Sequence, residues 1–104
     1  MNESKKVYCG IDNDAFGGMT PLGAIVKDAW LFQLIPETET CQNWTHSQLQ
    51  DLYDKVQKAW DKHGALVSLL PLDLREKHQR IHDKAILRAR ELGWDADAEL
   101  QDES

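Results

Sequence analysis

The sequence predicts an all-α protein: a compact three-helix domain with a short extended N-terminal arm and a disordered acidic C-terminal tail. Three observations lead to this fold class. Hydrophobic residues recur with helical period in three segments, and capping, proline and glycine residues mark the ends of those segments. Only one short segment favours a strand, and a single strand has no partner. The expected divisions are an arm and loop over 1–19, the helical domain over 20–94 and the tail over 95–104.

The arm begins with the only segment that resembles a strand, residues 5–11. Val7, Tyr8 and Ile11 favour extended backbone, but Gly10 interrupts them. We therefore expect an extended segment that lies against the helices, and a loop over the Asp-, Asn- and Gly-rich residues 12–19.

The first helix is predicted to begin at Thr20, a capping residue, followed by Pro21 at the first helical position. It should end near Leu34, because Pro36 disfavours helical geometry in the residue before it. Gly23 costs this helix about 1 kcal/mol relative to alanine. The helix is apolar on nearly all sides, so it lies either at the centre of the core or under a partner, which includes a second copy in a homodimer.

The second helix carries the strongest local signals. Thr45 and Gln48 form the pattern of a capping box, and Trp44 before the cap can pack on Leu49. Gly64 is placed to end the helix in a left-handed conformation.

The third helix is predicted to start at Pro71 or at Asp73, which with Glu76 resembles a capping box, and to end at Leu92. The apolar connection before it, residues 65–70, is expected to be short and buried. The predicted core of the three helices contains Trp30, Leu52, Val56, Trp60, Ile81 and Leu92.

Composition excludes several classes of protein. The 104 residues fit one domain and carry a net charge of −6, which argues against general affinity for nucleic acid. The N-terminus is polar, with no secretory signal, and no apolar stretch is long enough to cross a membrane. These features predict a cytoplasmic protein in which Cys9 and Cys41 are free thiols.

The third helix is an exception to the acidic balance, with six Lys or Arg residues and three acids between Leu74 and Leu92. Four of its basic residues, spaced by three or four positions, form one ridge beside an apolar residue that is expected to be exposed. The predicted partner-binding residues are Lys77, Arg80, Lys84, Leu87 and Arg88. The preferred function is a small non-enzymatic interaction or accessory protein that docks on a larger protein through this ridge or through the apolar first helix.

His78 and His82 lie one helical turn apart and project from the same face. The alternative function is therefore a metal-binding or redox protein that holds a transition metal such as zinc. A third ligand would come from His63, Cys9, Cys41 or Asp83. A metalloprotease motif is absent, because Gln79 rather than glutamate follows His78. A structural role is also open, since His78 is in register with the apolar stripe of the helix.

No catalytic site is predicted, and the sequence favours a protein without enzymatic activity or resident cofactor. None of the serines lies in a GxSxG turn, and neither cysteine has a local catalytic signature. Residues 12–14 resemble the start of a calcium loop, but Phe16 and Gly23 stand where oxygen ligands are required.

Overall fold

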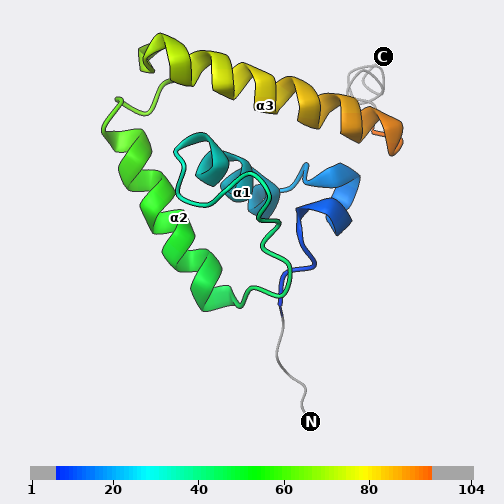
Figure 1. Cartoon of the computed structure of the whole chain (residues 1–104). Helices are drawn as coiled ribbons and strands as arrows, with labels where there is room; N and C mark the ends of the chain where they lie inside the picture. The colour runs from blue at the N-terminus through cyan, green and yellow to red at the C-terminus, as the bar shows by residue number, and fades with distance from the viewer. Residues whose placement is uncertain (1–6, 95–104) are drawn as a thin grey trace, which may run out of the picture.

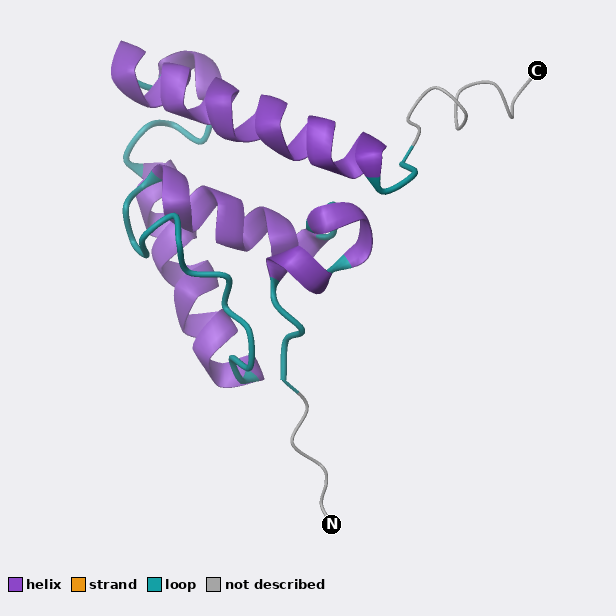
Figure 2. Cartoon of the chain, turned by 45° about the vertical axis from the view of Figure 1, so that its right-hand side comes forward, coloured by secondary structure: helices purple, strands orange, loops and turns teal. Residues whose placement is uncertain are grey.

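The computed structural model describes residues 7–94 and confirms the all-α fold class. Helix α1 lies at the centre, with α2 along one side and α3 across the other (Figures 1 and 2). No helix within 7–94 is long and apolar enough to span a bilayer. The elements are η1 (Ile11–Asn13), η2 (Ala15–Gly17), α1 (Pro21–Leu31), α2 (His46–Asp61), η3 (Val67–Leu69) and α3 (Leu72–Glu91).

Helix α1 begins as predicted and is the central element of the core. The Thr20 hydroxyl accepts a hydrogen bond from the Gly23 N–H at 3.0 Å, and Pro21 occupies the first turn. Val26 and Ala29 are fully buried against the neighbouring elements. Of the two expected positions for this apolar helix, the centre of the core is the one observed.

The helix ends at Leu31, earlier than predicted, through a left-handed residue. Gln33 has a φ of 60°, and its N–H donates to Trp30 O at 3.1 Å. The Leu34 N–H donates to Ala29 O at 2.9 Å, which completes a Schellman cap. Glycine occupies the matching position after α2 (Gly64) and α3 (Gly93), so only α1 has a side chain there.

Gln33→Gly is therefore expected to stabilise the protein by about 0.5 kcal/mol. The relief of left-handed strain, about 1 kcal/mol, exceeds the entropy that glycine adds to the unfolded chain. Urea unfolding measures the difference, and Gln33→Ala, which keeps the strain, is the control. A loss of stability in Gln33→Gly would contradict this account.

Helix α2 confirms its predicted caps. The Gln48 N–H donates to Thr45 Oγ1 at 3.2 Å, and the Thr45 N–H donates to Gln48 Oε1 at 2.8 Å. At the other end, the Ala65 N–H donates to Trp60 O at 2.9 Å after a left-handed Gly64.

Helix α3 corrects two predictions. Its N-cap is Pro71, without a side-chain hydrogen bond, so Asp73 lies inside the first turn and forms no capping box with Glu76. Leu92 is 51% exposed and lies outside the core, because the helix ends one residue earlier at Glu91.

The connection between α2 and α3 is exposed, and the prediction of a buried connection is wrong. Leu66 and Leu69 are 58% and 57% exposed, whereas Leu70 is buried against Leu31 and Ile81. The segment runs over the surface, as connections between helices usually do, and only its last apolar side chain reaches the core.

The N-terminal arm pairs with the segment before α2. The Tyr8 N–H donates to Trp44 O at 2.9 Å, and Asn43 returns a hydrogen bond to Tyr8 O at 2.8 Å. Tyr8 and Ile11 are buried in the same core cluster as residues of α1 and α2, so the described part of the arm packs against the helices. The predicted acidic tail lies outside the described residues.

Candidate functional site

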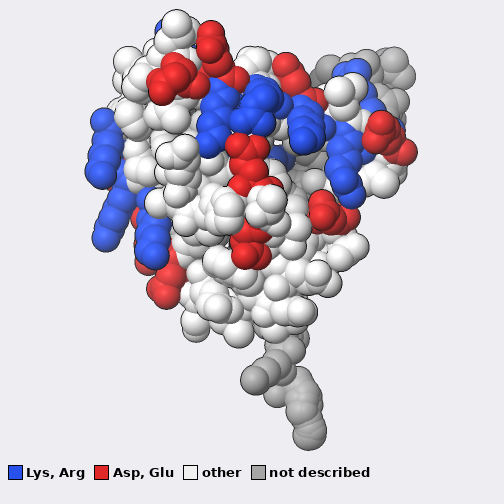
Figure 3. Space-filling view, in the orientation of Figure 1, with Lys and Arg blue, Asp and Glu red and all other residues white. Residues whose placement is uncertain are grey.

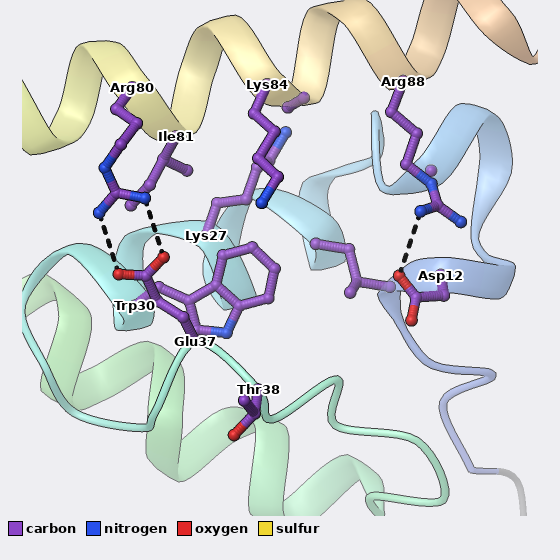
Figure 4. A pocket seen from close by; sticks show the side chains of 12 residues that line it. Asp12, Lys27, Trp30, Glu37, Thr38, Arg80, Ile81, Lys84 and Arg88 are labelled. Atoms are coloured by element: carbon purple, nitrogen blue, oxygen red, sulfur yellow. Dashed lines mark hydrogen bonds and ion pairs between the residues drawn. The ribbon is translucent and has the colours of Figure 1, made fainter.

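A cleft of about 390 Å³ lies between α3 on one side and α1, η1 and the segment after α1 on the other. Figure 3 shows Lys and Arg side chains in a row along α3 above it, and Figure 4 shows its interior. Apolar side chains such as Trp30 and Ile81 contribute to its lining. The charged residues of the lining are Asp12, Lys27, Glu37, Arg80, Lys84 and Arg88.

An ion pair stands at each end of the cleft (Figure 4). Arg80 donates two hydrogen bonds of 3.1 Å to the carboxylate of Glu37, and this contact holds the pKa of Glu37 below its usual range. Arg88 Nη1 lies 3.8 Å from Asp12 Oδ1. Both pairs are exposed to solvent, so they contribute little stability, but they link α3 to the segment after α1 and to η1.

The middle of the cleft contains two lysines. Lys27 from α1 and Lys84 from α3 lie between the two end pairs (Figure 4), and neither is within 4.0 Å of a carboxylate of residues 7–94. Lys27 is half-buried, and desolvation lowers its pKa although Asp28 and Asp14 act in the opposite direction. The centre of the cleft therefore holds two positive charges that have no ion-pair partner among the described residues.

Trp30 presents an apolar surface beside these lysines. Its indole N–H donates to the backbone oxygen of Glu39 at 2.9 Å, which fixes the ring and uses its only donor. Ile81 is buried nearby, so the cleft combines cationic groups with apolar surface.

The four basic residues of the predicted ridge lie on the side of α3 that faces the rest of the protein. Arg80, Lys84 and Arg88 line the cleft together with the buried Ile81, and Lys77 is 3.9 Å from Glu37. The apolar stripe of α3 is narrow, so the long cationic side chains beside it extend over the rest of the protein.

Leu87 is not part of the cleft. It is 64% exposed and lies near Ile86, Arg90 and Trp94 on another face of α3. The structure thus separates it from the basic residues with which the sequence grouped it.

Sequence reasoning missed Lys27, Trp30, Glu37 and Asp12 as members of this site. Lys27 had a usable signal, because it is the only basic residue in a helix that is otherwise apolar except for Asp28, and lysine is rarely buried without a reason. Glu37 had no such signal in the sequence, since it lies 43 residues away from its partner Arg80.

The histidine pair lies outside the cleft. The rings of His78 and His82 are stacked, with their centroids 6.3 Å apart. The rings of His78 and Trp60 form an edge-to-face contact, also with 6.3 Å between the centroids. Asp28 from α1 lines the same small cavity as the pair. Two histidines and a carboxylate are a ligand set that can bind zinc, but these three side chains do not gather as a metal site.

None of the four suggested third ligands joins the histidines. His63 stacks on Phe32 instead, at 6.0 Å between centroids. Cys41 is fully buried, which raises the pKa of its thiol to about 11. Within residues 7–94, no three His, Cys, Asp or Glu side chains gather as a metal site.

The cleft has the composition of a binding site. Its lining contains cations, two paired carboxylates and apolar groups, and it includes no histidine, cysteine or serine among the described residues. Such groups can hold an anion against apolar surface. Comparison with known proteins adds no relative: no protein-family model, curated protein or solved structure matches this chain.

Proposed function

We propose that this protein is a small non-enzymatic interaction protein that binds an acidic segment of a larger protein partner in the cleft beneath α3. The observation that carries the proposal is the pair Lys27 and Lys84, which stand in the cleft without a carboxylate partner among the described residues. The whole chain has a net charge of −6, so this positive site differs in sign from its surroundings.

The size of the cleft favours a segment over a broad surface. A volume of about 390 Å³ is in the range of small ligand sites and accommodates a few side chains. In this proposal Lys84 and Lys27 contact the partner, while Arg80 and Arg88 shape the ends of the cleft.

Docking through the apolar first helix has less support. Helix α1 contacts both α2 and α3, and its residues Val26, Ala29 and Leu31 are buried by them. A homodimer through α1 has less support for the same reason, because the monomer already buries much of the apolar surface of this helix.

Lys84→Glu is expected to weaken partner binding by about tenfold or more while the melting temperature stays unchanged. Lys84 has no ion pair within 4.0 Å among the described residues and acts on Glu37 only at longer range, so its replacement mainly removes the attraction for an acidic segment. Carbodiimide cross-linking of the captured complex, followed by mass spectrometry, should join Lys84 or Lys27 to an Asp or Glu of the partner.

The matched control is Lys55→Glu on the exposed face of α2, which changes the charge equally and should leave capture intact. Arg80→Glu is a poorer choice, because it would place a carboxylate against Glu37 and disturb the docking of α3. A partner that is captured equally well by Lys84→Glu would contradict the proposal.

A further inference from the structure

We infer that the cleft recognises one carboxylate next to one apolar side chain: Lys27 and Lys84 bind the carboxylate, and Trp30 with Ile81 binds a neighbouring aromatic or branched aliphatic group. This inference rests on the proposed function and specifies which acidic segments of a partner protein fit.

The distribution of charge favours a single monoanion. Arg80 and Arg88 are already paired with Glu37 and Asp12, so only the centre of the cleft lacks a counter-charge among the described residues. A ligand with several adjacent acids would place the additional ones toward Glu37 or Asp12, where like charges repel.

Lys27 supports a ligand because its ammonium group is partly desolvated and has no ion pair within 4.0 Å among the described residues. The side chain extends from a helix whose neighbouring Val26 is fully buried, and desolvation disfavours the ammonium even with Asp28 and Asp14 nearby. Within residues 7–94, the only hydrogen-bond acceptor of its Nζ is the weak one of Met19 Sδ, at 3.8 Å. A bound carboxylate would supply the stronger partner that the described residues do not provide.

The apolar requirement follows from the lining. The indole N–H of Trp30 is occupied by Glu39 O, so the ring offers carbon and π surface to a ligand. Ile81 and Ala85 lie on the opposite wall and have no polar side-chain atoms. A side chain beside the carboxylate is therefore held by apolar contact.

The test titrates the full-length, ¹⁵N-labelled protein with short peptides and follows the Trp30 indole and the amides of residues 80–88 by NMR. The first probe is acetyl-Ala-Ala-Glu-Phe-Ala-Ala-amide. The comparison probes replace Glu with Gln, Phe with Ala, or Glu with phosphoserine. The Glu–Phe peptide should bind about tenfold more tightly than the Gln–Phe and Glu–Ala peptides, and more tightly than the phosphoserine peptide.

Lys27→Met provides a second and independent measurement. It should reduce affinity for the Glu–Phe peptide by about tenfold, and its melting temperature should equal or exceed that of the wild type, because a half-buried charge has been removed. Lys55→Met, at an exposed position on α2, should change neither quantity.

The inference is overturned if the Glu–Ala or phosphoserine peptide binds as tightly as the Glu–Phe peptide, if none of the peptides binds, or if Lys27→Met keeps full affinity. A lower melting temperature for Lys27→Met would overturn the role given to Lys27. These outcomes differ from failure of the proposed function, which is shown by partner capture that does not depend on Lys84.

Discussion

Gly23→Ala is expected to destabilise the protein by about 3 kcal/mol, although alanine is the better helix former. In a free helix the change would gain about 1 kcal/mol. Here a Cβ at position 23 would lie 2.1 Å from the carbonyl oxygen of Gly18, which is backbone and cannot rotate away. The N-terminus of α1 would have to move off the preceding loop, and such overpacking costs more than the helix gains.

Urea unfolding monitored by circular dichroism measures this effect, and Gly93→Ala is the matched control. Gly93 has a φ of 101°, and a Cβ there meets no atom within 4 Å, so only backbone strain of about 1 kcal/mol is expected. A Gly23→Ala variant as stable as the wild type would show that the loop yields easily and that the close approach is not needed.

The helices could be predicted because their ends depend on local chemistry. Thr20, Thr45 and Gly64 act within a few residues of their own positions, and the structure shows each in its expected role. The end of α1 was placed too late because the pattern of apolar residues continues past Leu31 into the left-handed turn at Gln33. Only packing decides where such a pattern stops being helical.

The N-terminal arm shows that local sequence patterns do not predict pairing between distant segments. Tyr8 is hydrogen-bonded to backbone groups of Asn43 and Trp44, which lie in a segment without the composition of a strand. Pairing of this kind depends on how the chain returns past α1, so no signal near Tyr8 identifies its partner.

The candidate site was predictable only in part, because local patterns identify the residues on one helix face but not the groups opposite them. Helical period brings Arg80, Lys84 and Arg88 onto one face, and the structure confirms that they lie together in the cleft lining. Where that face points depends on the narrow stripe around Ile81, and the opposing groups, such as Glu37, come from distant parts of the chain.

Asp14 is the hydrogen-bond centre that fixes the arm to α1. One of its carboxylate oxygens accepts hydrogen bonds from the Tyr8 hydroxyl, at 2.6 Å, and from the Thr20 hydroxyl. The other accepts from the Ala15 N–H at 2.7 Å. Partial burial raises the pKa of Asp14, but the hydrogen bonds from Thr20, Tyr8 and Ala15 outweigh it, so the pKa lies below its usual range.

Asp14→Asn is therefore expected to cost about 2 kcal/mol at pH 7, since hydrogen bonds to a charged acceptor are worth more than those to an amide, with a reduction for the exposure of this site. An aspartate with a lowered pKa contributes stability above its unfolded pKa of about 3.9 and loses it as the pH falls through the folded value. The difference in unfolding free energy between wild type and variant should thus be constant near neutrality and shrink below about pH 4.

Urea unfolding across this pH range measures the difference in unfolding free energy. The control is Asp12→Asn, at an exposed ion pair with Arg88, which should change little. A difference that persists unchanged into acid would mean that the shape of the Asp14 side chain, and not its charge, holds Tyr8 and Thr20 together.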